Sequence, residues 1–185
     1  MGIRYATISK TGRRSNNEDC FNVLEMPEHN CFMGIVCDGM GGHSFGETAS
    51  ETVCNTISDF WKKHISMPDC DSKVKLACKK ASCAIDKKTF ELHHAEMGTT
   101  MVMVSIENDV ATIAHIGDSR CYVQKDLVMD YFIRQKTISG LISDGRLLPN
   151  ASSLTAPKWL YQIFDKSSYR LVTECCCVRT DYTKA

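Results

Sequence analysis

The sequence predicts an α+β fold with antiparallel sheets, because helical and strand patterns occupy separate blocks of the chain. Runs typical of strands fill much of the first forty residues. Apolar residues at helical spacing then dominate residues 49–85, and β-rich runs separated by short turns return over residues 99–133. Helices bunched between blocks of strands indicate antiparallel sheets, whereas a parallel sheet requires strands and helices in alternation.

Three strands are expected near the N-terminus. Residues 3–9 and 20–24 read as strands, and residues 32–37 (FMGIVC) are continuously apolar, as in a strand buried on both faces. A polar, glycine-rich segment, DGMGGHSFGE, follows at residues 38–47 and predicts a turn.

Two helices follow this turn. In the first, apolar residues recur at helical spacing from Ala49 to Ile65, and Pro68 ends the pattern. In the second, Asp71 or Ser72 can cap a helix whose apolar face continues to Ile85.

Strands return after the helices. Residues 99–106 (TTMVMVSI) and 110–116 (VATIAHI) flank the turn pair Asn108-Asp109, which predicts a hairpin. Residues 120–124 and 128–133 continue the strand pattern.

Beyond residue 137 the pattern weakens. Residues 138–148 are expected to form a short helix that ends near Gly145, and Pro149 and Pro157 mark irregular chain. Residues 158–185 show no clear period.

Composition narrows the class of protein. Of the 185 residues, 43% are hydrophobic, and 22 basic residues balance 22 acidic ones. These proportions are typical of a globular domain that buries its own core. The lack of a basic excess argues against nucleic acid as a partner. No apolar run reaches the length of a membrane helix, and the first residues lack the apolar stretch of a signal peptide. We therefore expect a cytoplasmic protein that does not bind membranes. We also expect a monomer.

The pattern of cysteines indicates reduced thiols in the protein interior. The chain has 11 of them, and most stand singly in apolar stretches, where a thiol behaves as a small hydrophobe. No C-x-x-C pair occurs, which argues against a thiolate zinc site. The run at residues 175–177 is open to two interpretations, an accident of the tail or a metal or redox role.

Three acidic or glycine-rich segments stand where predicted strands begin or end. Residues 14–19 (RSNNED) precede one strand, residues 38–43 (DGMGGH) follow another, and residues 117–120 (GDSR) join two. Carboxylates at such places can converge on one site, and Mg²⁺ and Mn²⁺ prefer oxygen ligands. Taken singly, each segment is equally typical of a solvated turn.

Four segments of the chain form an ordered set of motifs. They are TGRRSNNED at residues 11–19, GIVCDGMGGHSFGETAS at 34–50, GTT at 98–100 and IAHIGDSRCYV at 113–123. Together they resemble the motifs of the metal-dependent protein serine/threonine phosphatases of type 2C (the PPM family), in their bacterial form. The resemblance predicts a phosphatase domain at residues 1–157.

Within this domain, residues 3–125 form the expected core. The segment 126–157 resembles a flap, through IRQKTISGLISDGRLLP at 133–149. Residues 158–185 are then a divergent tail.

The family resemblance implies a β-sandwich flanked by helices on both faces (αββα layers), here incomplete at the C-terminus. It also implies two Mn²⁺ or Mg²⁺ ions at one edge, with a third in bacterial members. In the family, a water or hydroxide that bridges the metals attacks the phosphorus of phosphoserine or phosphothreonine, and no phosphoenzyme forms.

Residue by residue, the resemblance assigns roles to the acidic segments. Asp38 matches the aspartate that bridges the two metals, and Gly39 matches the glycine whose carbonyl binds one of them. Glu18 matches the acid that holds a metal-bound water, with Asp19 as its supporting neighbour. Arg14 matches the arginine that binds the substrate phosphate, a role that suits a planar, bidentate donor.

Further candidates come from the remaining motifs. Asp118 matches an aspartate associated with the third metal. Thr100 is either a hydrogen-bonding residue of the site or a plain strand residue. His43 lies four residues after Gly39 and is a weaker candidate to contact substrate, and His115 is better explained as an ordinary strand residue.

The sequence departs from the family in its last third. The family uses two further metal-binding aspartates there, one in Ser-Asp-Gly and one in Asp-Asn-x-Thr. Asp144, in Ser143-Asp144-Gly145, and Asp181, in Asp181-Tyr182-Thr183, are weak stand-ins.

Three explanations remain for this departure: a gene fragment or frameshifted product, a naturally shortened inactive relative, or a site completed by a partner chain. We favour the first. The expected function is hydrolysis of phosphoserine and phosphothreonine in a phosphorylated protein, with a protein kinase among the candidate partners. The alternative is an inactive, phosphatase-like binding or regulatory module.

Overall fold

The computed structural model describes residues 3–40, 45–67, 70–107, 110–125, 128–131, 141–142, 169–174 and 178–184. Its elements follow the chain in the order β1 (Ile3–Ser9), β2 (Asp19–Met26), the 3-10 turn η1 (Pro27–His29), β3 (Cys31–Asp38), α1 (Gly46–Lys63), α2 (Cys70–Glu91), β4 (Gly98–Thr99), β5 (Met101–Glu107), β6 (Val110–Ile116), β7 (Arg120–Lys125), β8 (Val128–Tyr131), β9 (Leu141–Ile142), β10 (Tyr169–Glu174) and β11 (Val178–Lys184).

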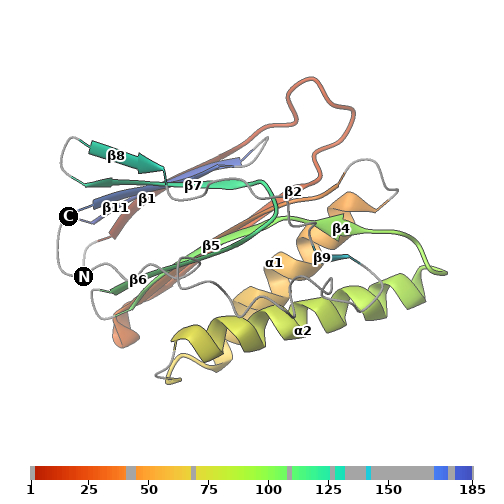
Figure 1. Cartoon of the computed structure of the whole chain (residues 1–185), viewed down its shortest axis with the longest axis horizontal. Helices are drawn as coiled ribbons and strands as arrows, with labels where there is room; N and C mark the ends of the chain where they lie inside the picture. The colour runs from red at the N-terminus through yellow and green to blue at the C-terminus, as the bar shows by residue number, and fades with distance from the viewer. Residues whose placement is uncertain are drawn as a thin grey trace.

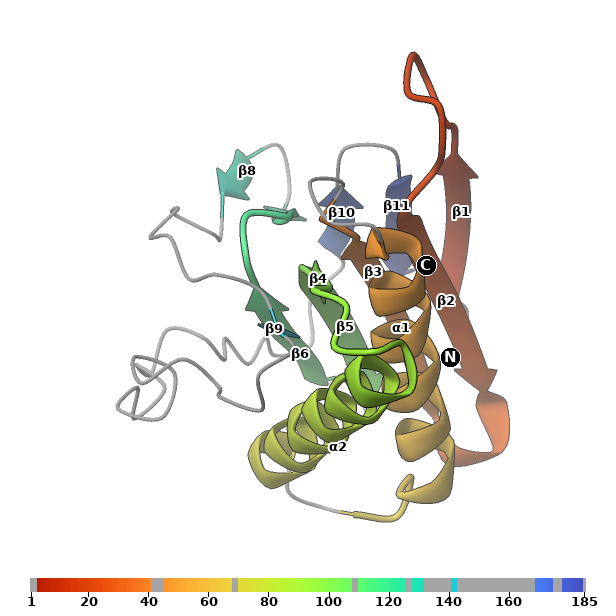
Figure 2. The same cartoon turned by 90° about the vertical axis from the view of Figure 1, so that its right-hand side faces the viewer.

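Two sheets and a pair of helices form three layers (Figure 1). One sheet has the strand order β2-β3-β5-β6, and the other has the order β1-β11-β10-β7-β8. Helices α1 and α2 pack together on the face of the first sheet that points away from the second (Figure 2). The predicted α+β sandwich is therefore confirmed, while a helical layer on the outer face of the second sheet is not among the residues that the structure describes.

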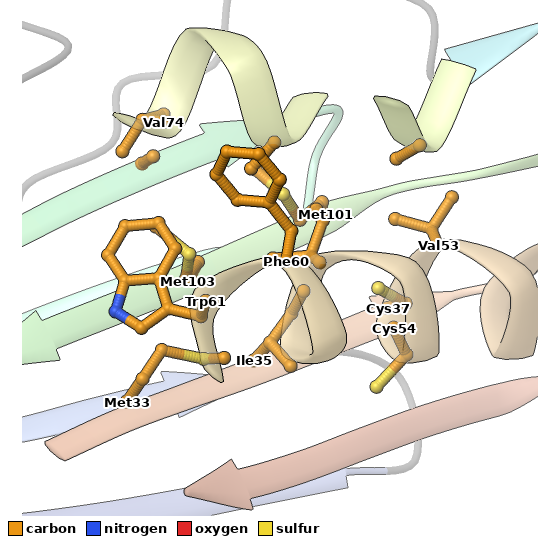
Figure 3. Packing of buried hydrophobic residues seen from close by; sticks show 14 of the residues in the cluster. Met33, Ile35, Cys37, Val53, Cys54, Phe60, Trp61, Val74, Met101 and Met103 are labelled. Carbon is orange, nitrogen blue, oxygen red and sulfur yellow. The ribbon is translucent and has the colours of Figure 1, made fainter. Parts of the chain in front are cut away.

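The side chains of alternate β3 residues pack into two different apolar clusters, one on each face of the sheet. Met33, Ile35 and Cys37 pack against the helices in one apolar cluster (Figure 3). Phe32 packs on the opposite side, in a cluster that includes Cys121 of the second sheet. This alternation explains why the predicted strand is continuously apolar, because both of its faces are buried.

The helices differ from their predicted bounds at the ends. Helix α1 ends at Lys63, before Ile65, and the N–H of His64 closes its last turn on the carbonyl oxygens of Phe60 and Trp61 at 3.0 and 3.3 Å. Helix α2 continues beyond Ile85 to Glu91. Within the described ranges, no helix is both long and apolar enough to span a bilayer.

The predicted strand at residues 99–106 is interrupted at Thr100, which separates β4 from β5. The predicted helix at residues 138–148 is wrong where the structure describes it, because residues 141–142 form β9 and pair with Gly98 and Thr99. The physical reason is that β4 presents an open edge whose backbone groups require partners.

The last stretch of the chain, which lacks a clear sequence period, contains two strands. β10 pairs with β7, and β11 pairs with both β10 and β1, so strands from the two ends of the chain lie side by side. Placement beside partners, rather than a sequence pattern, identifies these strands.

Candidate active site

Asp19 and Asp38 lie directly opposite each other at the end of β2 and β3. The neighbouring residues Glu18 and Gly39 are joined by a backbone hydrogen bond, with the Gly39 N–H donating to the Glu18 oxygen at 3.1 Å. In an antiparallel ladder the next pair is then of the non-hydrogen-bonded type, in which side chains approach most closely. The side chains of such a pair leave the sheet on the same face, so two carboxylates extend from neighbouring strands at this edge.

The backbone of Asp38 is fixed by two threonines. Its carbonyl oxygen accepts the Thr100 N–H at 2.9 Å and the Thr99 hydroxyl at 3.0 Å, and its own N–H donates to Thr100 Oγ1 at 3.1 Å. These hydrogen bonds fix the Asp38 backbone, and with it the point at the sheet edge from which the carboxylate extends.

Gly39 sits in a space that no side chain can occupy. A Cβ atom built there would lie 2.2 Å from the Gly46 carbonyl oxygen and 2.6 Å from the Glu18 carbonyl oxygen. The first residue of α1 therefore packs directly on the end of β3. This cradle explains the glycine by close backbone approach.

The carboxyl group of Glu18 lies beside the start of α1. A Cβ atom on Gly46 would be 3.0 Å from the Glu18 carboxyl carbon. The start of a helix carries a partial positive charge, which attracts a carboxylate placed beside it. Ser50 Oγ, one turn further along α1, donates to the Glu18 carbonyl oxygen at 2.6 Å and fixes the backbone as well.

Asp118 is exposed, and the residues on either side of it contact Thr100. A Cβ atom on Gly117 would lie 2.7 Å from Thr100 Cγ2, and Gly117 has a positive φ of 94°. Ser119 Oγ lies 2.5 Å from Thr100 Oγ1. The loop that carries Asp118 is thus attached to the same threonine that binds the Asp38 backbone.

Arg14 lies on the loop between β1 and β2, which extends beyond the sheet in Figure 1. The residue is exposed, and its N–H donates to Thr11 O at 3.3 Å in a turn. Two asparagines anchor the loop: Asn16 Nδ2 donates to Glu47 of α1 at 3.0 Å, and Asn17 Nδ2 donates to Ser9 Oγ at 2.8 Å.

The remaining candidate residues lie outside the described ranges or on other strands. His43 and Asp144 lie outside the described residues. The backbone of Asp181 lies in β11, opposite Ala6, in the sheet that does not contain Asp38. His115 occupies an ordinary strand position in β6, where burial lowers the pKa of its imidazole.

In the ranges that the structure describes, no three His, Cys, Asp or Glu side chains gather closely enough to hold a metal ion. The described residues supply part of an oxygen donor set: the carboxylate of Asp38 with Asp19 opposite, and the backbone of Gly39 beside Glu18. These oxygen groups suit Mg²⁺ or Mn²⁺ by chemistry.

Four supporting residues were not predicted: Gly46, Ser50, Thr99 and Ser119. Each is buried. Their positions in the GHSFGETAS, GTT and GDSR segments are the only sequence signal that could have indicated them, because a small polar residue has no period of its own.

The chain resembles known proteins both in sequence and in fold. A family model described as protein phosphatase 2C matches residues 9–136. The serine/threonine phosphatase Stp of Listeria monocytogenes is 32% identical over 129 residues, which are 67% of this chain and 49% of that protein. The chain thus spans about half the length of the curated relatives it matches.

Two solved structures share the fold. The crystal structure of a bacterial serine phosphatase has a TM-score of 0.73 at 19% identity, covering 94% of this chain and 78% of that one. The catalytic domain of the serine/threonine phosphatase PstP, in complex with two manganese ions, has a TM-score of 0.67 at 21% identity, covering 98% and 96%.

Proposed function

Because the chain belongs to the protein phosphatase 2C family, we propose that it hydrolyses phosphoserine and phosphothreonine in proteins, with Mn²⁺ or Mg²⁺ as cofactor. The observation that carries the proposal is the opposed pair Asp19 and Asp38, held at one edge of the sheet beside the Gly39 cradle.

The donor chemistry of this edge fits a hard divalent cation. We assign metal contacts to the Asp38 carboxylate and the Gly39 carbonyl, a water-mediated contact to Glu18, and a further contact to Asp118, with Asp19 as the supporting neighbour. When bound, such cations supply Lewis-acid activation of the attacking water and neutralise the phosphoryl oxygens. The PstP catalytic domain, with its two manganese ions, is the structural precedent among proteins of this fold.

The chain's own residues would perform three tasks. Arg14 would bind two phosphoryl oxygens through its guanidinium fork and set the direction of the phosphorus. Asp38, fixed through Thr99 and Thr100, would hold its carboxylate at one place in every turnover. Glu18 would hold a metal-bound water beside the start of α1.

The alternative is a phosphatase-like binding or regulatory module without turnover. One observation favours it, namely that the described ranges contain no group of three metal-ligating side chains. Under this alternative Arg14 still binds a phosphorylated peptide, whereas tight cation binding and hydrolysis are both absent.

Phosphate release from a phosphothreonine peptide, with Mn²⁺ or with EDTA, distinguishes the two functions. We expect Mn²⁺-dependent release by this chain, lost in Asp38→Asn by at least about a hundredfold, the scale for a group that stabilises transition-state charge. Asp59→Asn is the matched control, since Asp59 is an exposed residue of α1 that lies 3.9 Å from Lys62.

Calorimetric titration with Mn²⁺ gives a second readout that does not depend on turnover. Tight binding that Asp38→Asn removes supports the phosphatase. Absence of both binding and hydrolysis, with retained binding of the phosphopeptide, would support the non-catalytic module instead.

A further inference from the structure

We propose that Ser119 is a positioning residue, which holds the Asp38 backbone and the Asp118 loop in a fixed relation through Thr100. The inference concerns the same site and rests on the proposed function for its catalytic consequence. Its structural part rests only on contacts within the chain.

The contacts form a short chain of hydrogen bonds. The Asp38 N–H donates to Thr100 Oγ1 at 3.1 Å, and Thr100 Oγ1 lies 2.5 Å from Ser119 Oγ. A hydroxyl has one donor and two acceptor positions, so Thr100 can accept from Asp38 while it shares a proton with Ser119. Such linked bonds strengthen one another in a site from which water is excluded.

Burial makes these bonds consequential. Thr100 is 6% exposed and Ser119 is 4% exposed. A buried hydroxyl that loses its partner cannot replace it with bulk water and bears the full cost of desolvation. The pair is therefore expected to remain closed and to restrict the Thr100 side chain to one rotamer.

The loop is attached to Thr100 on both sides of Asp118. Gly117 packs so closely on Thr100 Cγ2 that a Cβ atom would lie 2.7 Å away, and Ser119 bonds the Oγ1 atom of the same side chain. Asp118 lies between these two contacts and is exposed. Two acidic residues that are far apart in the sequence, Asp38 and Asp118, are thereby tied to one threonine.

The first test is amide hydrogen exchange, measured by NMR on the full chain without metal. Ser119→Ala and Thr100→Val should each accelerate exchange of the Asp38 amide about fivefold or more, because one net hydrogen bond is lost. Ser119→Thr, which retains the hydroxyl, should restore protection. Ser105→Ala is the matched control, because Ser105 is another fully buried serine whose Oγ donates to Glu107 at 2.9 Å, at the opposite end of β5.

The second test is the Mn²⁺ concentration that gives half-maximal phosphate release. Ser119→Ala should raise this concentration and lower kcat, while KM for the phosphopeptide, which depends on Arg14, stays within about twofold. Ser119→Thr should return both values toward wild type. A Ser119→Ala variant that loses stability but keeps the wild-type Mn²⁺ dependence would assign Ser119 a purely structural role and overturn the catalytic part.

The two proposals fail in different ways. A wild-type chain without Mn²⁺-dependent release contradicts the proposed function, and the exchange experiment then still decides the coupling. Unchanged exchange at Asp38 in both Ser119→Ala and Thr100→Val overturns the inference whether or not the chain is active. In a double-mutant cycle, additive effects of the two substitutions on the free energy of unfolding would contradict a direct coupling between the hydroxyls.

Discussion

The Cα atom of Gly39 packs against the carbonyl group of Gly46, so that a Cβ atom on Gly39 would lie 2.2 Å from the Gly46 oxygen. This contact joins the end of β3 to the start of α1 and leaves no room for any side chain. The position of the Gly39 backbone in the candidate metal site is therefore fixed by contact with the first residue of α1.

Gly39→Ala is therefore expected to lower the free energy of unfolding by about 3 kcal/mol, since the nearby atoms belong to the backbone and cannot rotate away. Urea unfolding followed by circular dichroism measures the change. Gly12→Ala is the control: Gly12 has a φ of 65° in open space, so only the left-handed backbone costs energy, about 1 kcal/mol. Equal losses in the two variants would contradict the crowding argument.

A buried ion pair joins α2 to the end of β5, away from the candidate metal site. Lys73 Nζ is 2.8 Å from Glu107 Oε1 and 4.3 Å from the centre of the Trp61 ring, and its side chain is fully buried. Lys73→Met should destabilise the fold by roughly 3–5 kcal/mol, because it leaves a largely buried carboxylate without its cation.

Lys88→Met is the matched control for this pair. It removes a half-exposed lysine that lies 3.0 Å from Glu91, and such a pair contributes little because water and salt screen it. Thermal or urea unfolding compares the variants. If Lys73→Met were no more costly than Lys88→Met, the buried pair would not stabilise the fold.

His115 predicts how stability depends on pH. Burial lowers the pKa of its imidazole below the ordinary value of 6.5. Between the two pKa values the unfolded chain binds a proton that the folded chain does not, so the free energy of unfolding increases with pH and this contribution is lost as pH falls below 6.5.

Replacing His115 with glutamine should therefore reduce the loss of stability on acidification from about pH 7 to pH 5, the range over which histidine titrates. Urea titrations at several pH values measure the slope. His29→Gln, at an exposed position, is the control. A similar change of slope in both variants would rule out the burial of His115 as the cause.

The cysteines should differ in reactivity with iodoacetamide. Cys83 is exposed on α2, whereas Cys121 is fully buried, and burial raises the pKa of its thiol to about 12. Only the thiolate reacts, so near pH 8 Cys83 should be alkylated well before Cys121. Peptide mass spectrometry measures the two alkylation rates, and unfolding the chain in urea should make them equal. Equal labelling rates in the folded chain would contradict the burial of Cys121 between the sheets.

Both helices were predictable from apolar residues at helical spacing, and the strand at residues 32–37 from its continuous apolar run. The α+β class followed from the separate blocks of strands and helices. Motif order indicated a family whose fold the comparisons confirm, and the roles that this family implies for Glu18, Asp38 and Gly39 stay predictions. The short helix at 138–148 was wrong, since a weak local pattern yielded to the open edge of β4.

By itself, the sequence determined the two helices, the strands within residues 3–133 and which acidic residues stand at strand ends. Only the tertiary structure decided that Asp19 lies opposite Asp38, that Gly46 fills the space beside Gly39, and that Ser119 reaches Thr100. The physical reason is that period and propensity are local properties. Register and close packing arise between segments distant in the chain, where hydrogen bonds and excluded volume select one arrangement.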